Sequence, residues 1–341
     1  MKWLENRKNR IEWIDYYKAF AIILVLIGHI SENKVINNWI YLFHMPAFIF
    51  ISGLLYNENK SNMKKRLKNI LIPYFSFSIL SFVYWLFIER NLRNQLNINP
   101  FSVFINIFLM FCGNENYIYN IPLWFLPALF MIETISSLLL KIKGNEKIKL
   151  FVIIILSIMI SYFLSKYLNI HLPFALDCAM ILLPFFILGM MVNKKIIKFP
   201  SINNSYGYVF LAIVSFIVIC LCVYSGCRVD INNLLITNYF VFIISSFNGI
   251  IFLYSLSKIV KIKYLQWLGI NSLCIMLIHE PIKRIVLQVL SKVTKIELVL
   301  LRTNFFFVLI DTILLILILI PIVFVVNEYF GYLLGRKVKN E

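Results

Sequence analysis

The sequence is poor in charged residues, and acidic residues are the scarcer kind. Charged residues make up 14% of the 341 residues, with 16 Asp or Glu against 33 Lys or Arg, whereas hydrophobic residues make up 61%. This composition is far too apolar for a soluble globular protein of that length. No polar stretch is long enough to form a separate soluble domain, so we expect one membrane-embedded domain over residues 1–341.

Several motifs of common enzyme classes are also missing. The sequence contains no glycine-rich phosphate loop, no dinucleotide-binding fingerprint and no paired histidines with the spacing of a zinc site. Its six cysteines are scattered and do not form the double pairs of a zinc finger. We interpret them as small apolar filler, with a disulfide among the clustered Cys220, Cys222 and Cys227 as the alternative. We therefore expect no metal.

The net charge of +17 raises the question of nucleic acid binding. The basic residues cluster at the ends of apolar segments, as the positive-inside rule describes for the cytoplasmic loops of membrane proteins. Because this distribution accounts for the charge without a nucleic acid, the expected partner is the lipid bilayer.

Long apolar runs recur along the chain and predict an all-α, polytopic integral membrane protein. The candidate spans are residues 13–30, 38–56, 70–88, 121–140, 149–168, 174–193, 207–225, 236–257, 265–281 and 305–330. A further apolar stretch at 101–112 is too short to cross and is predicted to be re-entrant or interfacial. The predicted fold is a bundle of about ten transmembrane helices plus this short segment.

The charges of the loops orient this bundle. Residues 57–69 and 141–149 are strongly basic and are predicted to be cytoplasmic, which requires an even number of crossings between them. Both termini are then cytoplasmic, and all four histidines fall in or beside the outer half of the membrane. Segment 282–304, which carries five basic residues on the predicted outside, is expected to lie along the surface as an amphipathic helix.

The first span carries ionisable groups, which are costly in a bilayer and indicate function by default. Lys18 and His29 are close to three helical turns apart, so they share one face at a separation of about 16 Å. Asp15 precedes Lys18 by about one turn. Because a neutral imidazole can deprotonate a hydroxyl, we predict that His29 is the catalytic base, assisted by Lys18 and Asp15. The alternative is a histidine that only binds a neighbouring helix.

Polar side chains in the other spans are candidate substrate-binding residues. They are His44, Ser52, Trp124, Glu133, Asp177 and His279. Each has a structural alternative, because serine can serve helix packing, tryptophan can anchor a helix at the interface, and buried carboxylates can hold helices together.

A cluster of basic residues lies in the predicted cytoplasmic loop after the second span. It contains Lys64, Lys65, Arg66 and Lys68, in the stretch KKRLKNILIPYF. Topogenic charge accounts for such a cluster, but a nucleotide with several phosphates would also bind there.

Taken in order, these segments resemble the acyltransferase 3 family of membrane O-acyltransferases. The leading motif of that family is an arginine separated by ten residues from a histidine. Here His29 matches the histidine, and Lys18 stands in the place of the arginine. This replacement keeps the positive charge but loses the bidentate hydrogen bonding of a guanidinium group. Arg10 and Asp15 match residues that precede the motif. Further matching segments are FHMPAFIFISG and KRLKNILIPYF, and the segments LWFLPALF, LDCAMILLPFFILG and LGINSLCIMLIHEP resemble the fucose 4-O-acetylase-like subgroup.

The resemblance implies an enzyme of the bacterial cytoplasmic membrane that transfers an acyl group, usually acetyl from acetyl-CoA, to a glycan hydroxyl. Acceptors in the family include capsule, lipopolysaccharide and exopolysaccharide sugars. We expect acetyl-CoA to dock on the cytoplasmic side against Arg10 and the basic cluster, with its pantetheine arm passing Lys18 toward His29. A transporter or flippase of a glycolipid or small molecule is the alternative, although the sequence shows no convincing internal repeat, and a non-catalytic scaffold is the third reading.

Overall fold

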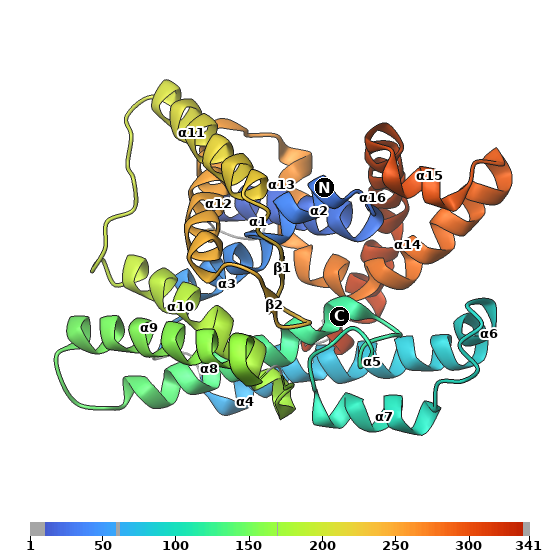
Figure 1. The fold of residues 1–341 in the computed structure, drawn as a ribbon, viewed down its shortest axis with the longest axis horizontal. Helices are drawn as coiled ribbons and strands as arrows, with labels where there is room; N and C mark the ends of the chain where they lie inside the picture. The colour runs from blue at the N-terminus through green and yellow to red at the C-terminus, as the bar shows by residue number, and fades with distance from the viewer. Residues whose placement is uncertain (1–10, 59–61, 169, 337–341) are drawn as a thin grey trace.

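The computed structural model describes residues 11–58, 62–168 and 170–336, and this part of the chain is almost entirely helical (Figure 1). Short π or 3-10 turns are labelled η. In chain order the helices and turns are α1 (Glu12–Ile30), α2 (Lys34–Tyr41), α3 (His44–Leu54), α4 (Met63–Arg66), η1 (Leu67–Leu71), α5 (Ile72–Tyr84), η2 (Trp85–Glu89), α6 (Arg90–Leu92), α7 (Pro100–Leu109), η3 (Ile121–Trp124), α8 (Phe125–Leu140), α9 (Glu146–Phe163), η4 (Leu164–Leu168), η5 (Pro173–Ala175), α10 (Leu176–Asn193), α11 (Ser205–Tyr224), α12 (Tyr239–Ile259), α13 (Lys263–Ile270), α14 (Ser272–Thr294), α15 (Leu298–Thr303), α16 (Phe305–Tyr329) and η6 (Gly331–Leu334).

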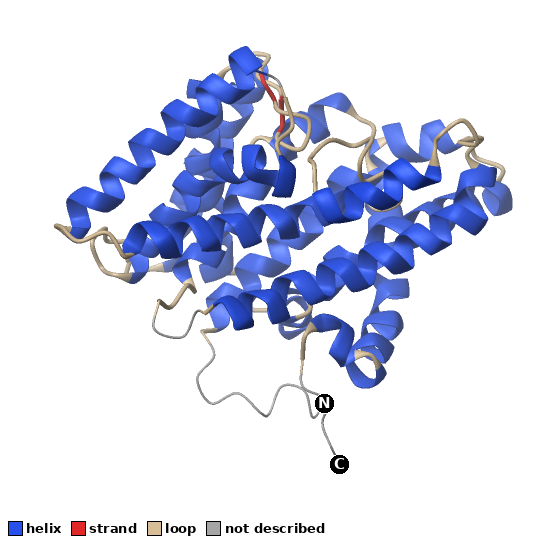
Figure 2. Ribbon diagram, turned by 90° about the horizontal axis from the view of Figure 1, so that it is seen from below, coloured by secondary structure: helices blue, strands red, loops and turns tan. Residues whose placement is uncertain are grey.

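One small hairpin interrupts the helices of the described chain. Strand β1 (Val229–Asp230) pairs antiparallel with β2 (Leu235–Ile236), and Val229 lies opposite Ile236. Figure 2 shows this hairpin in red at one edge of the helical bundle. It lies between α11 and α12, where it contributes a loop to the candidate active site.

Nine helical stretches among the described residues are long and apolar enough to cross a membrane. They are Glu12–Ile30, Lys34–Leu54, Met63–Leu92, Ile121–Leu140, Glu146–Tyr167, Pro173–Asn193, Ser205–Tyr224, Tyr239–Ile259 and Phe305–Tyr329. The predicted all-α polytopic membrane bundle is therefore confirmed. The short apolar stretch predicted at 101–112 is the ten-residue helix α7.

The region after residue 260 differs from the predicted boundaries. The expected span 265–281 breaks at Asn271 between α13 and α14, and it is not among the nine apolar candidates. The expected surface helix over 282–304 is also wrong in its limits, because α14 continues through Pro281 to Thr294 and α15 follows as a separate short helix. The reason is that α14 buries ionisable side chains against the bundle, so a hydropathy pattern misplaces its ends.

Asparagine side chains begin many of these helices. An Asn side-chain oxygen accepts a hydrogen bond from a backbone N–H of the first turn at Asn33, Asn62, Asn99, Asn145, Asn204, Asn238 and Asn304. Such caps satisfy N–H groups that have no partner inside the helix. The abundance of asparagine at the ends of apolar runs therefore has a structural use, since it fixes where each helix starts.

The centre of the bundle is formed by α1, α3, α10 and α12. The helix pair α3 and α10 is in backbone contact, because a Cβ atom at Gly53 would overlap the Phe186 carbonyl and one at Gly189 would overlap the Phe50 carbonyl. Peripheral helices are far less covered: only 22% of the apolar window of α11 is buried, against 78% for Pro173–Asn193. In Figure 1, α14, α15 and α16 gather on one side of the molecule and α9 and α10 on the other.

Candidate active site

His29 lies in the last turn of α1, next to a polar segment of α14. Its Nδ1 atom is 3.5 Å from Oε2 of Glu280, and its ring centroid is 5.2 Å from that of His279 in an edge-on arrangement. The His29 side chain is 16% exposed, whereas Glu280 and His279 are buried. A histidine at the end of the first span thus meets a second histidine and a carboxylate that come from a distant part of the chain.

Two cations hold the Glu280 carboxylate in place. Lys283 donates to both of its oxygens at 2.8 and 2.9 Å, and Arg284 donates to Oε1 at 3.0 Å. Lys283 also donates to the backbone carbonyl of His29 at 3.0 Å, so it connects α14 to the end of α1. Arg284 reaches further, to the buried carboxylate of Glu89 at 2.8 and 2.9 Å. A buried charge needs such partners, and this network satisfies Glu280 from several sides.

The second imidazole, His279, has one nitrogen occupied and one available. Its Nδ1 atom lies 3.0 Å from the carbonyls of Ile275 and Met276, which can only accept, so Nδ1 carries the proton. Its buried Nε2 atom has no hydrogen-bond partner among the described residues. His279 therefore presents a lone pair at a completely buried position beside His29.

Proline shapes α14 at this point. Pro281 has no N–H, so the carbonyl of Leu277 loses its helical donor. The side-chain amide of Asn120 donates to that carbonyl at 2.8 Å and to Ser81 Oγ at 3.0 Å. The turn of α14 that carries His279 and Glu280 is therefore stabilised by a side chain from the loop before η3.

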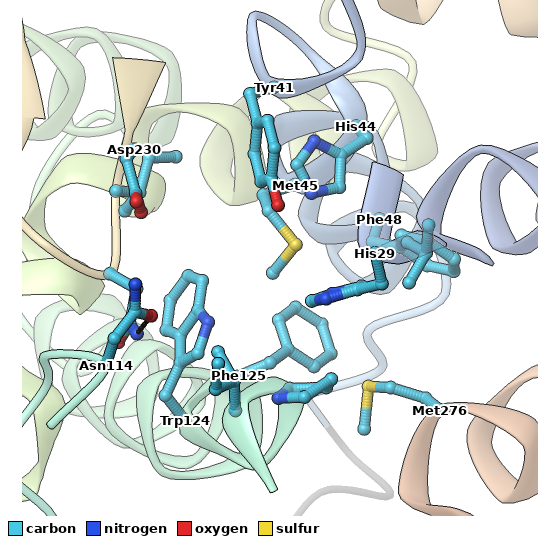
Figure 3. A pocket seen from close by; sticks show the side chains of 15 residues that line it. His29, Tyr41, His44, Met45, Phe48, Asn114, Trp124, Phe125, Asp230 and Met276 are labelled. Carbon is cyan, nitrogen blue, oxygen red and sulfur yellow. Dashed lines mark hydrogen bonds between the residues drawn. The ribbon is translucent and has the colours of Figure 1, made fainter. Parts of the chain in front are cut away.

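His29 opens onto a first cavity, which we call the narrow pocket. Its volume is about 100 Å³, and its lining is mostly aromatic and aliphatic. The lining residues are Val25, His29, Tyr41, His44, Met45, Phe48, Asn114, Ile121, Pro122, Trp124, Phe125, Asp230, Ile231, Asn232 and Met276. Figure 3 shows the imidazole of His29 pointing into this pocket, with Trp124 on the facing wall. Three of the predicted site residues, His29, His44 and Trp124, thus share one cavity.

A second cavity, the wide pocket, also includes His29. Its volume is about 440 Å³, and it is lined by Gly28, His29, Ser31, Glu32, Asn37, Tyr41, Glu89, Arg93, Ile121, Glu280, Lys283, Arg284, Leu287, Gln288, Leu298 and Arg302. Most of these side chains are polar or charged. His29, Tyr41 and Ile121 belong to both cavities and therefore form the boundary between them.

A third cavity gathers part of the predicted nucleotide site. This basic pocket has a volume of about 450 Å³ and is lined by Ser52, Leu55, Tyr56, Asn57, Lys65, Arg66, Asn69, Ile70 and Glu133. Arg66 is buried, and its Nε atom lies 3.8 Å from Oε2 of Glu133. The structure therefore places the predicted substrate residues Ser52 and Glu133 with the basic cluster instead of with His29.

The remaining residues of the basic cluster lie beside this pocket or outside the described chain. Lys64 is exposed and Lys68 is half-buried, and neither lines the basic pocket. Arg10 lies outside the described residues.

Asp15 and Lys18 lie toward the other end of α1 from His29. Asp15 is buried against α13, where Gln266 Nε2 donates to its Oδ2 at 3.4 Å. Lys18 is half-buried and does not line any of the three pockets. Since α1 is a continuous helix, the predicted separation between Lys18 and His29 holds, and these residues do not meet.

Asp177 lies apart from the His29 site. The fully buried carboxylate binds His171, whose Nδ1 atom lies 2.9 Å from Asp177 Oδ2, and it does not line any of the three pockets. His171 is therefore separated from His29 and His44, which line the narrow pocket, and from His279, which contacts His29.

Asp230 brings a carboxyl group to the narrow pocket from the hairpin, outside the membrane-spanning helices. Burial raises the pKa of Asp230 above its ordinary value, while hydrogen bonds from Asn233 oppose this shift. One of them is a 2.7 Å bond from Asn233 Nδ2 to Asp230 Oδ2.

Several residues of the site were not among the candidates chosen from the sequence. They are Tyr41, Glu89, Asn120, Asp230, Glu280, Lys283 and Arg284. The segment IHEPIKR carried a signal, since four ionisable residues follow an apolar run there. Glu89 and Asn120 carried no such signal, because their roles depend on contacts with α14. Glu89 is 195 residues from its partner Arg284, and Asn120 is 157 residues from its partner Leu277.

Comparison with known proteins gives one match, to a protein family. A family model described as an acyltransferase domain matches residues 11–327, a range that contains all three pockets. Comparison with curated proteins and with solved structures found no match.

Proposed function

The chain belongs to the acyltransferase 3 family, and from this premise we propose that it moves an acetyl group from acetyl-CoA to a glycan hydroxyl. The family match favours acyl transfer over the transporter or flippase considered above. The nine long apolar helices found in the described part of the chain identify an integral membrane protein. We place it in the bacterial cytoplasmic membrane with both termini in the cytoplasm, following the distribution of basic loops.

The placement of His29 between two unlike pockets carries this proposal. The narrow pocket is mostly apolar and matches a thioester with a short acyl group, while the wide pocket is large and polar enough for a sugar. A base at their boundary reaches both reactants at once. Holding two reactants in this way removes much of the entropic barrier to their reaction.

We assign the donor a route along α3 and α8. Ser52 of the basic pocket and Phe48 of the narrow pocket are one helical turn apart, and Ser52 Oγ donates to the Phe48 carbonyl at 3.0 Å. On α8, Glu133 and Phe125 line the same two pockets. The phosphates would bind at Lys65 and the pantetheine arm would follow these helices to His29. This route differs from the expected one past Lys18, whose role stays a prediction.

The chemistry follows from the partners of His29. With Nδ1–H directed at the Glu280 carboxylate, Nε2 keeps its lone pair and removes the proton from the acceptor hydroxyl. The hydroxyl oxygen then attacks the thioester carbonyl, the carbon–sulfur bond breaks, and the departing CoA thiolate takes the proton from His29. Glu280 stabilises the imidazolium that exists between these proton transfers. An acetyl group carried on His29 itself is the other path consistent with these contacts.

Labelled acetyl-CoA tests this function. Membranes containing wild type, His29→Ala or Lys292→Gln are incubated with labelled acetyl-CoA and glycan from the producing host, and label in the glycan is measured. Lys292 is an exposed position on α14 and serves as the control. We expect transfer by wild type and Lys292→Gln and a loss of at least 100-fold in His29→Ala, within the range attributed to general-base catalysis.

The location of each protein in the membrane fraction and its elution as a single detergent-solubilised species confirm that the variants are intact. Equal labelling by His29→Ala and wild type would refute the assigned base. Transport of a glycolipid or small molecule in proteoliposomes, without covalent transfer of the acetyl group, would refute the proposed acyltransferase activity.

A further inference from the structure

A second cluster of reactive side chains lies apart from the three pockets. The thiols of Cys112 and Cys178 and the carboxylate of Asp177 have ligand atoms within 4.8 Å of one another, and all three residues are buried. Cys112 lies in the loop after α7, while Asp177 and Cys178 lie in the first turn of α10. None of the three lines the narrow, wide or basic pocket, so the His29 chemistry does not account for them.

The Asp177 carboxylate points to a missing ligand. The residue is completely buried, and its Oδ2 atom binds His171 at 2.9 Å. Its other oxygen, Oδ1, is buried and has no hydrogen-bond partner among the described residues. An unsatisfied buried carboxylate oxygen is costly, and a cation beside it would remove that cost.

Three separate segments build this cluster. Cys178 Sγ donates to the carbonyl of Ile231 in the hairpin at 3.2 Å, and the Ala175 N–H donates to the Met110 carbonyl at 2.8 Å. Gly113, next to Cys112, donates its N–H to Asn232 Oδ1 at 3.0 Å. Ile231 and Asn232 line the narrow pocket, so the cluster lies directly behind one of its walls.

We propose that Cys112, Asp177 and Cys178 bind one Zn²⁺ ion, with His171 holding the Asp177 carboxylate from outside. Two thiolates and one carboxylate form a mixed sulfur and oxygen donor set, which suits zinc. Mg²⁺ and Ca²⁺ prefer oxygen ligands alone and therefore do not suit this site. A hydrogen-bonded partner behind a ligand is typical of such sites. Binding releases the two thiol protons, so Cys178 exchanges its hydrogen bond to the Ile231 carbonyl for a bond to the ion, which then ties the loop after α7 to α10.

This proposal departs from the expectation of no metal that the sequence supported, and the experiment below decides between the two. Cys112 and Cys178 lie far apart in the chain, so no ligand spacing could indicate them. Only the packing of the loop after α7 against α10 brings the two sulfur atoms together.

Metal analysis of the full chain tests the proposal. The protein is purified in detergent with a non-chelating phosphine reductant, equilibrated with ZnCl₂, desalted, and analysed for metal by mass spectrometry. We expect about one zinc per chain in wild type and in the control Cys220→Ser, and at least a tenfold loss in Cys112→Ser, Cys178→Ser and Asp177→Asn. His171→Ala should weaken zinc binding by about 10- to 100-fold.

Two measurements on wild type keep the test decisive if a variant fails to fold. Cobalt in place of zinc should give a thiolate-to-cobalt charge-transfer band, and a chelator should lower the Tm in a way that added zinc reverses. A Cys112–Cys178 disulfide in the intact mass of unreduced protein would overturn the proposal. Absence of bound zinc, or equal zinc in wild type and variants, would overturn it too.

Discussion

The side-chain amide of Asn120 donates a hydrogen bond of 2.8 Å to the backbone carbonyl of Leu277. This bond replaces the helical one that Pro281 cannot make, immediately before the segment that presents His279 and Glu280 to His29. Helices in membranes tolerate proline when a neighbouring group takes up the released carbonyl. Asn120 is thus a positioning residue for α14, although it lies in a different part of the chain.

Replacing Asn120 with Ala should lower both thermal stability and turnover. The carbonyl of Leu277 and the hydroxyl of Ser81 would lose a buried donor, at a cost of about 1–3 kcal/mol for an unsatisfied group. The Tm in detergent and kcat should fall, while the KM for acetyl-CoA changes little because the basic pocket is untouched. Asn91→Ala, at an exposed position of α6, is the control. An unchanged Tm and kcat would show that Asn120 does not support α14.

Replacing Glu280 with Gln should remove most of the activity while preserving the shape of the side chain. The variant deprives the His29 imidazolium of its carboxylate and removes the negative charge that Lys283 and Arg284 share. We expect kcat to fall by about 100-fold or more, as for the loss of a group that assists a general base. Steady-state kinetics of Glu280→Gln and of the exposed control Glu297→Gln provide the comparison. If both variants turn over like wild type, Glu280 does not act on His29.

Replacing Lys65 with Gln should weaken donor binding alone. Lys65 is exposed and lines the basic pocket, so its loss removes one charge from the assigned phosphate site. The KM for acetyl-CoA should rise by about 3- to 10-fold with kcat unchanged, which is the pattern for binding shared by ground and transition states. Lys147→Gln, an exposed position on α9, should leave KM unchanged. A fall in kcat without a change in KM would place the phosphates elsewhere.

Replacing Phe48 with Ala should allow longer acyl groups. Phe48 lines the narrow pocket, whose volume of about 100 Å³ would limit the length of the acyl chain in the proposed reaction. Because one methylene in an apolar pocket changes kcat/KM by about 10- to 200-fold, the ratio of butyryl-CoA to acetyl-CoA turnover should rise at least tenfold. Phe163→Ala, on an exposed part of α9, controls for the loss of an aromatic ring. An unchanged ratio would mean that the acyl group does not bind beside Phe48.

Asp230 should make stability depend on pH. Because burial raises the pKa of Asp230 in the folded protein, the folded state holds a proton that the unfolded state releases earlier. The stabilising contribution is complete below the unfolded pKa and is lost as the pH rises through the raised folded pKa. Between the unfolded and the folded pKa of Asp230, the Tm of Asp230→Asn should therefore depend less on pH than that of wild type. Above the folded pKa, Asp230→Asn should be more stable than wild type.

A pH series of Tm measurements in detergent tests this, with the exposed Glu115→Gln as control. If the Tm values of wild type and Asp230→Asn change with pH in parallel, the pKa of Asp230 is the same in the folded and unfolded states.

The sequence was sufficient for the fold class, and the predicted base His29 lies at the boundary of two pockets, where its role stays a prediction. The nine described helices that can span a membrane are long apolar runs, which hydropathy detects without tertiary information. Helix α14 is different, because Glu280, Lys283 and Arg284 lie among apolar residues, bind one another, and find further partners at the His29 carbonyl and Glu89. A local pattern cannot represent such pairing, so the expected ends of this helix were wrong.

The grouping of site residues was predictable only in part. His29 was predicted as the catalytic base and His44 and Trp124 as substrate-binding residues, and the structure places all three in one pocket. Ser52 and Glu133 lie instead with Arg66, because helices α3 and α8 each extend from one pocket to the other. The position of a residue along α3 or α8 decides whether it lines the narrow or the basic pocket. The spacing in the sequence does not show which pocket lies at which end of the helix.

The backbone contact between α3 and α10 at Gly53 and Gly189 limits how this protein can diversify. Because no side chain fits between the two helices there, their spacing cannot be adjusted by a single substitution. Met45 and Phe48 on α3 face the narrow pocket and have no such restriction. Under the proposed function, substitutions at these two positions would change which acyl group fits while the spacing of α3 and α10 stays the same.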